Sequence, residues 1–217
     1  MNSKKTAAVR GRPRDFDIDK ALDKAMRVFW RKGYLGTSLS DLTKSMGINR
    51  PSLYSAFGDK QSLFHKALDH YADGPSAYLR EALKEPTARA VVEHILLEVV
   101  EMSTDSRNPG CLLVHGAFSC GDPSDPIRQE VAERRESIEG DLKKRFNRAI
   151  VEGDLPRDAD AGALARFVLT INVGIAVQAA TGATRAELLR VAEIVLGAWP
   201  PMKASLPRRT TSRRRGH

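Results

Sequence analysis

The sequence contains little cysteine and no long apolar run, and both shortages exclude whole classes of protein. Two cysteines among 217 residues cannot build a disulfide framework, which fits a reducing compartment. Lys4 and Lys5 have no apolar run behind them, so no secretory signal is expected. The most apolar segment, residues 167–183, is short and contains Asn172 and Gln178, which predicts a buried helix rather than a membrane span. We therefore expect a soluble, cytoplasmic protein with no membrane partner.

A period-two alternation of apolar and polar residues is also missing, so no β-strand is predicted. Apolar residues instead recur three and four positions apart, in segments separated by turns that contain Gly and Pro, such as residues 108–110 and 121–123. A chain of this length has room for one or two domains with a core. The expected fold class is all-α, with about nine helices.

Charge is divided unevenly along the chain, whose net charge is +8. Residues 1–66 hold 14 Lys and Arg against 6 Asp and Glu, and residues 67–200 hold 15 against 21. Residues 201–217 hold six basic residues and no acid. A basic first third and a basic tail around an acidic body suggest a polyanion-binding module on a separate domain. A basic solvated face is the alternative.

Residues 37–60 carry the start and stop signals of two short helices. Ser38 with Asp41 three residues later is a variant of the capping box, which starts a helix over about residues 40–46. Gly47 ends that helix, since glycine adopts positive φ without steric cost. Asn49 is the next N-cap, and Pro51 fits the first turn of a helix over about residues 50–57. This pattern predicts a helix-turn-helix, with an ordinary αα-hairpin as the alternative.

Helices are expected on both sides of this motif. Asp17 is the N-cap of a preceding helix that ends before Gly33, and Asp59 caps a following helix that residues 73–75 end. The following helix leaves a three-helix head and enters the rest of the chain, so we expect it to act as the lever between them. These limits predict a DNA-binding domain over residues 15–66 and a ligand-binding and dimerisation domain over residues 67–200.

The two ends of the chain are polar and basic, and both are expected to be disordered. Residues 10–14, with the sequence RGRPR, resemble the core of an AT-hook, which would place Arg12 and Arg14 in a narrow A·T minor groove. Residues 1–14 are therefore interpreted as a basic DNA-contacting arm, with a merely solvated tail as the alternative. Residues 201–217 form the second basic tail.

The last two predicted helices suggest self-association. Residues 160–180 are rich in Gly and Ala, and Thr184 with Glu187 forms a full capping box for a helix that runs to Trp199. Two adjacent antiparallel helices with small and apolar faces make half of a four-helix bundle, which a second copy completes about a two-fold axis. The alternative is that both helices are buried within one chain. The predicted dimerisation residues are Phe167, Ile171, Gly174, Ile175, Leu188, Val191, Val195 and Trp199.

Two short stretches and nine further residues form a family-like pattern: FWRKGY at residues 29–34, KQSLF at residues 60–64, and Thr37, Ser38, Asp41, Leu42, Gly47, Ile48, Leu53, Tyr54 and Phe57. In these residues and in the order of its parts, the chain resembles the TetR family of bacterial one-component repressors over about residues 15–66. The rest resembles the family only in its number of helices and in its paired C-terminal helices. The resemblance implies an N-terminal three-helix DNA-binding domain, an all-helical ligand domain and a homodimer on a palindromic double-stranded DNA operator.

The resemblance also implies which residues meet DNA. By position, residues 50–52, 54 and 55 face the major groove, while Thr37, Ser38 and Lys60 hold phosphates. The alternative is that Lys60 is an ordinary surface lysine without a DNA contact. Pro51 replaces a Gly or small polar residue of the family pattern, so its contact is expected to be apolar, as with a thymine methyl. The candidate DNA-binding residues are Arg12, Arg14, Thr37, Ser38, Asn49, Arg50, Pro51, Ser52, Tyr54, Ser55 and Lys60.

Cys111 leads the candidates for an effector site. The GCLLV stretch at residues 110–114 resembles a subgroup in which a cysteine at the start of the sixth helix senses electrophiles or oxidants. A helix N-terminus stabilises a thiolate, which supports that role. Cys120 lies nine residues on, roughly 13 Å along a helix, which is too far for a disulfide. Both cysteines can also be small buried apolar residues.

The full set of effector or sensor candidates is Cys111, His115, His94 and Phe118. His115 lies four residues after Cys111 on the same helical face, where it can tune the thiol or line a pocket. A metal site that joins His94 and His115 to Cys111 is disfavoured, because no ligand spacing is diagnostic. We therefore expect neither a metal nor a cofactor.

These features together predict a dimeric repressor that a small-molecule or thiol-reactive effector releases from its operator by shifting the connecting helix. The first alternative is a sequence-tolerant architectural DNA-binding protein that uses the arm and the tail, for which the acidic helical body has no use. The second is a small thiol enzyme built on Cys111 and His115, for which no resolving cysteine or acid lies nearby. We do not expect an enzyme.

Overall fold

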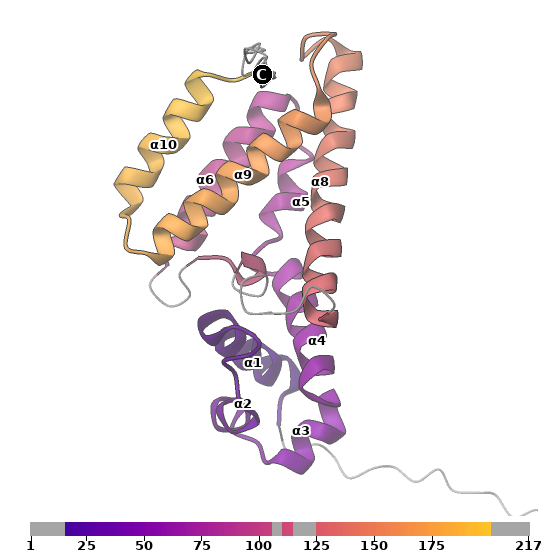
Figure 1. Cartoon of the computed structure of the whole chain (residues 1–217), viewed down its shortest axis with the longest axis vertical. Coiled ribbons are helices and arrows are strands. Elements are labelled where there is room, and N and C mark those ends of the chain that lie inside the picture. The colour runs from indigo at the N-terminus through magenta and orange to yellow at the C-terminus, as the bar shows by residue number, and fades with distance from the viewer. Residues whose placement is uncertain (1–15, 106–109, 115–124, 201–217) are drawn as a thin grey trace, which may run out of the picture.

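The computed structural model describes residues 16–105, 110–114 and 125–200, and within these ranges it contains helices and no strand (Figure 1). This confirms the predicted all-α class. Four candidate residues lie outside the described ranges, namely Arg12, Arg14, His115 and Phe118, as does Cys120. The helices are α1 (Ile18–Lys32), α2 (Leu39–Met46), α3 (Arg50–Phe57), α4 (Lys60–Asp73), α5 (Tyr78–Ala82), α6 (Ala88–Ser103), α8 (Pro126–Glu152), α9 (Ala161–Ala180) and α10 (Arg185–Gly197).

The predicted caps start the first four helices. The side chains of Asp17, Ser38, Asn49 and Asp59 each accept a hydrogen bond from the backbone N–H three residues on. Such a bond satisfies one of the free donors at a helix N-terminus. Gly47 has φ 73°, the left-handed conformation that ends α2. These local signals confirm the predicted helix-turn-helix, formed by α2 and α3.

The helices α1–α4 lie in the lower part of Figure 1, and aromatic rings link α1 to α4. The Phe29 ring meets Phe64 edge-on with centroids 4.9 Å apart, and Tyr34 lies 5.1 Å from Phe64. Leu53 and Phe57 of α3 are buried in the same core, which we call the head cluster. This core extends beyond α1–α4, because it also contains four residues from later in the chain. They are Leu112, Leu113, Ile127 and Val131.

A second core, the body cluster, lies between α5, α6, α8, α9 and α10. α9 packs against both α6 and α8, and α10 packs against α6. By length and composition alone, α9 is long and apolar enough to cross a membrane, a test that the core helices of soluble proteins also pass. Here it contributes to the body cluster, and its buried Asn172 donates from Nδ2 to the Tyr78 hydroxyl at 3.0 Å. One face of α9 is thus a core face.

Half of the predicted dimerisation residues belong to the body cluster instead. Ile175, Leu188, Val195 and Trp199 are buried within the single chain. Trp199 packs on Phe146 with ring centroids 5.5 Å apart. These four side chains leave little surface for a partner, so their part in a dimer stays a prediction that burial within one chain does not favour. The other four keep more exposure: Phe167, Ile171, Gly174 and Val191.

The helix α4 passes from the head into the body, where charged side chains tie it to α8. Arg134 of α8 donates to Asp69 of α4 at 2.7 Å, and His65 of α4 pairs with Glu130 of α8. The predicted boundary between residues 66 and 67 lies inside α4, so head and body share this helix.

Candidate nucleic-acid interface and cavity

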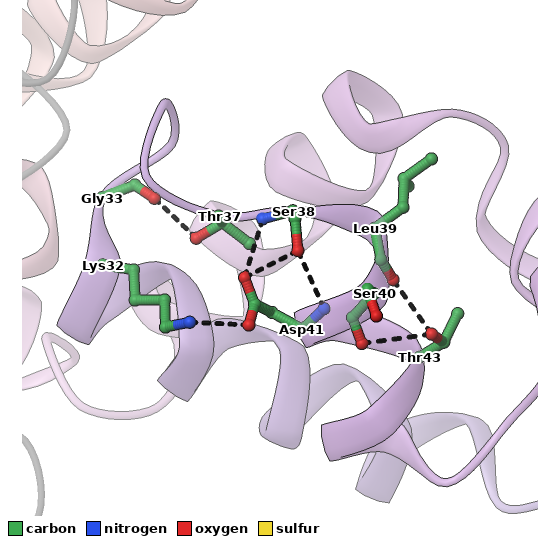
Figure 2. A network of polar contacts seen from close by, with 8 residues as sticks. All are labelled: Lys32, Gly33, Thr37, Ser38, Leu39, Ser40, Asp41 and Thr43. Atoms are coloured by element: carbon green, nitrogen blue, oxygen red, sulfur yellow. Dashed lines mark hydrogen bonds and ion pairs between the residues drawn. The ribbon is translucent and has the colours of Figure 1, made fainter.

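A polar network fixes α2 against α1 (Figure 2). Lys32 Nζ lies 2.6 Å from Asp41 Oδ1, and the backbone N–H and hydroxyl of Ser38 donate to Asp41 Oδ2 at 3.0 and 2.8 Å. The Asp41 N–H donates back to the Ser38 hydroxyl, which completes the capping box. Lys32 first, and then Ser38, hold the pKa of Asp41 well below its usual range. The helix-turn-helix is therefore anchored by a carboxylate that stays charged at neutral pH.

Thr37 is placed differently from its prediction. Its side chain is buried, and its hydroxyl donates to the Gly33 carbonyl at 2.6 Å (Figure 2). The only side-chain proton that Thr37 has for a phosphate is thus used within the head, so the predicted phosphate contact is wrong. Ser38 is exposed, but its hydroxyl is engaged with Asp41. Its phosphate contact stays a prediction.

The helix α3 separates a packing face from a polar face. Leu53 and Phe57 are buried, whereas Arg50, Tyr54 and Ser55 are exposed along the other side. Two further candidates border this face: Pro51, which is exposed, and Ser52, which is half-buried and donates its N–H to Asn49 Oδ1 at 2.8 Å. The structure therefore brings residues 50, 51, 54 and 55 onto one exposed surface, which is what contact with a DNA groove requires.

Lys60 begins α4 beside this surface. Its Nζ lies 4.3 Å from the centroid of the Tyr34 ring, a cation–π contact, and partial burial lowers the pKa of its ammonium group. Tyr34 in turn packs on Phe64 of the head cluster. The ring thus holds the lysine head group at the N-terminal end of α4, where a DNA phosphate contact is predicted.

A cavity of about 280 Å³ lies in the body, between α4, α5, α8, α9 and residues 111–114. Its walls are mainly apolar, with polar atoms from a few residues. Arg166 and Glu139 at its lining pair at 2.7 Å. The cavity is close to the lower end of the size range of small-molecule sites, roughly 300 Å³, and such sites are mostly apolar with a few placed polar groups. The polar lining residues are Tyr71, Ser76, Tyr78, Cys111, Arg135, Glu139, Arg166, Thr170 and Asn172.

Of the two predicted effector residues that the structure describes, Cys111 and His94, Cys111 lines this cavity. Its Sγ accepts a hydrogen bond of 3.3 Å from the Tyr71 hydroxyl. His94 is not part of the lining of this cavity, and its Nδ1 pairs with Glu85 at 2.9 Å, so its role at an effector site stays a prediction that this cavity does not support. No cluster of three His, Cys, Asp or Glu suited to a metal occurs among the residues that the structure describes.

Sequence reasoning missed the two phenols of this cavity. Tyr71 is not among the predicted site residues, yet its hydroxyl reaches Cys111 across 40 positions of sequence. Tyr78 accepts a hydrogen bond from Asn172, one of the two amide residues that interrupt the most apolar segment of the chain. Burial raises the pKa of both Tyr71 and Tyr78, so both stay protonated donors at neutral pH. Asn172, an amide within an otherwise apolar stretch, was the signal that could have found this site.

The similarity to known proteins covers both parts of the chain. A family model described as "Bacterial regulatory proteins, tetR family" matches residues 21–67. A second, described as "Tetracyclin repressor-like, C-terminal domain", matches residues 86–195. The chain belongs to the TetR family. This confirms the resemblance found in the head and extends it to the body.

Two relatives of this TetR protein are transcriptional regulators, and the similarity covers most of the length of each. It is 32% identical to the HTH-type transcriptional repressor ComR of Escherichia coli (strain K12) over 196 residues, which cover 89% of this chain and 93% of ComR. The uncharacterized HTH-type transcriptional regulator YezE of Bacillus subtilis (strain 168) is 35% identical over 162 residues, with coverage of 73% and 83%. This TetR protein is accordingly a DNA-binding transcriptional repressor.

A solved structure similar to this TetR protein contains DNA. It is a cysteine mutant of the TetR family transcriptional regulator CifR complexed with 26-bp double-strand operator DNA. CifR shares 43% identity with this chain at a TM-score of 0.82, over 87% of this chain and 100% of CifR. The similarity includes both the head and the body.

Proposed function

We propose that this repressor binds a palindromic operator as a homodimer and that an effector in the cavity releases it. The observation that carries this proposal is the position of Tyr71, which lines the cavity and belongs to α4, the helix that begins at the DNA-facing Lys60. An occupant of the cavity therefore touches the helix on which the head is mounted. Such a repressor acts where the chromosome is, in the cytoplasm, and has no catalytic role.

The proposed dimer surface combines exposed residues of α9 and α10. Val191 is exposed beside a groove between these helices, which Ile171 and Gly174 also line. Val177 and Ile194 are exposed as well, Ile194 to 72%. Several exposed apolar side chains on neighbouring helices mark an interaction surface. A second copy about a two-fold axis covers them and builds a four-helix bundle.

Two heads on such a dimer meet the major groove at successive turns. The half-sites of a palindromic operator are then expected about 34–36 Å apart, one turn of B-DNA. The charge distribution favours this arrangement, because the basic residues 1–66 face DNA while the acidic body stays away from phosphates.

The decisive measurement is fluorescence anisotropy with DNA from the repressor's own promoter region and a scrambled fragment of equal length. Specific binding is expected to exceed binding to the scrambled fragment by at least about 10³-fold at physiological salt. A steep salt dependence with no difference between the fragments would instead favour an architectural DNA-binding protein.

A thiol-reactive effector is the more specific form of this proposal. The observation in its favour is that Cys111 is half-buried and lines the cavity, which offers a small reagent a path to its thiol. Operator release by an electrophile should then occur in the unaltered protein and fail in Cys111→Ser. Equal release of both proteins would leave a repressor whose effector binds the cavity without reacting with the thiol.

A further inference from the structure

Three polar or sulfur-bearing side chains meet where the head cluster joins the body cluster. The Tyr71 hydroxyl lies 3.3 Å from Cys111 Sγ and 3.8 Å from Met102 Sδ. Among the described residues, Met102 and Cys111 are the partly buried side chains that pack against both clusters. The hydroxyl of Tyr71 therefore sits between the two sulfur atoms at the boundary of the two cores.

The ring of Tyr71 reaches into the head on its other side. It meets Trp30 of α1 edge-on, with centroids 4.8 Å apart and an interplanar angle of 87°. Both side chains are almost fully buried. α1 in turn holds α2 through the Lys32–Asp41 pair. One side chain thus contacts the cavity thiol with its hydroxyl and the DNA-binding head with its ring.

We propose that Tyr71 is a positioning residue that couples the state of Cys111 to the position of the head. In the arrangement seen here, its hydroxyl has the thiol sulfur as acceptor. A ligand or covalent group at Sγ displaces the Tyr71 hydroxyl from this acceptor. The phenol must then move, together with α4 and Trp30. This inference deepens the proposed function and rests on it, since it names the residue that transmits the effector signal.

Apart from a movement of α4, the Tyr71 phenol has few ways to respond to the loss of its acceptor. Burial, and then the neighbouring Cys111, raise the pKa of Tyr71, so it cannot relieve the loss by ionising. A buried hydroxyl without an acceptor is unfavourable, and Met102 Sδ is a weak and more distant acceptor. Rotation of the ring is opposed by its packing against Trp30. A small shift of α4 is the remaining response.

Tyr78 supplies a matched comparison within the same cavity. It is also a buried phenol and also lines the cavity, but its hydroxyl bonds to Asn172 of α9. Tyr78 and Asn172 both belong to helices of the body, and Tyr78 packs in the body cluster. Loss of its hydroxyl therefore alters the cavity without altering a contact with the head.

The experiment uses iodoacetamide as the probe of Cys111, in full-length protein that carries Cys120→Ser. The thiolate sulfur forms a bond to the CH₂ carbon, the C–I bond breaks, iodide leaves and the thiol proton passes to solvent. Mass spectrometry checks that Cys111 is labelled to the same extent in the parent, in Tyr71→Phe and in Tyr78→Phe. Operator affinity is then measured by anisotropy before and after labelling.

Labelling is expected to weaken operator binding by roughly tenfold or more in the parent and in Tyr78→Phe. In Tyr71→Phe the same adduct should weaken it by less than about threefold, because no hydroxyl is left to displace. A loss in Tyr71→Phe that equals the loss in Tyr78→Phe overturns the inference. Specific binding with no release in the parent overturns it as well, while leaving a DNA-binding repressor.

A second readout needs no DNA and so separates this inference from the proposed function. Hydrogen–deuterium exchange of α1 peptides around Trp30 should rise on labelling in the parent and in Tyr78→Phe, and stay unchanged in Tyr71→Phe. Cys111→Ala, which removes the acceptor without any reagent, should raise the same exchange, and added Tyr71→Phe should restore it. Exchange that Tyr71→Phe does not restore would show that Tyr71 only packs.

Discussion

Arg134 of α8 donates a hydrogen bond to Asp69 of α4 across 2.7 Å, which ties the body to the helix that leads into the head. The same guanidinium donates to Glu130 at 2.7 Å, and Glu130 also pairs with His65 of α4. Burial alone would lower the pKa of Arg134, but its bonds to Asp69 and Glu130 outweigh this and raise that pKa. Arg134, Asp69, Glu130 and His65 thus form a single junction.

Replacing Arg134 by Met is expected to destabilise the protein by about 1–3 kcal/mol, because it leaves the largely buried Glu130 without its strongest partner. Urea unfolding measures this loss. Lys144→Met is the matched control, since Lys144 forms an exposed pair with Asp141 at 2.9 Å on the same helix. That change should cost less than about 0.5 kcal/mol. Equal losses in the two variants would contradict a structural role for the junction.

Acid is expected to remove the contribution of Asp41 to stability. Hydrogen bonds from Lys32 and then from Ser38 hold the pKa of Asp41 below its ordinary 3.8. A group whose pKa is lower in the folded state stabilises the fold above the unfolded pKa and loses this effect as pH falls through the folded pKa. Asp41→Asn should therefore lower the Tm at neutral pH, and its gap from the unaltered protein should narrow below about pH 4.

Circular dichroism melts over that range test the Asp41 prediction, with Asp141→Asn as the control from an exposed pair. The control should show little difference from the unaltered protein at any pH. A gap for Asp41→Asn that persists unchanged in acid would mean that its effect is steric rather than electrostatic.

Arg50 is predicted to read or position DNA from the exposed face of α3. Arg50→Ala should weaken specific operator binding by about 1–3 kcal/mol and relax sequence preference, with no change in Tm. Anisotropy titrations on the operator and on single-base variants measure both effects. Arg128→Ala, on the exposed surface of α8, is the control and should bind as the unaltered protein does. A uniform loss on every sequence would make Arg50 a phosphate contact instead.

Lys60 is predicted to contact a DNA phosphate, so its loss should weaken binding equally on every sequence. Lys60→Gln removes the ammonium group held over Tyr34 and is expected to reduce the slope of log affinity against log salt by about 1. The preference for operator over scrambled DNA should stay the same. Titrations at several salt concentrations check this, and an unaltered slope would show that Lys60 is an ordinary surface lysine.

The head could be read from sequence because its signals are local. Ser38 with Asp41, Gly47 and Asn49 each act within a few residues, and each behaves as the pattern predicted. Thr37 fails for an equally local reason that the family pattern does not carry, its hydroxyl bond to Gly33. Periodicity finds the faces of α2 and α3, but not where a hydroxyl proton goes.

The contacts of the body could not be predicted, because they join residues that lie far apart in the sequence. The pairing of Tyr71 with Cys111 depends on how α4 packs against residues 110–114, which no local pattern specifies. On α10 the apolar residues form two faces rather than one. Val195 enters the core while its neighbour Ile194 points outward, and composition alone does not distinguish them. The sequence predicted that α9 and α10 carry apolar faces, but not which residues are left for a partner.

Ile194 therefore supplies the sharpest test of the proposed dimer. Its side chain is 72% exposed on α10, so Ile194→Asp should fold normally but place a charge in the centre of an apolar interface. Sedimentation velocity is expected to show a monomer, and operator affinity should fall because two linked heads become two separate ones. Val151→Asp, at an even more exposed apolar residue on α8, controls for the added charge and should remain dimeric. If Ile194→Asp also remains a dimer, the two copies meet through some other surface than the outer faces of α9 and α10.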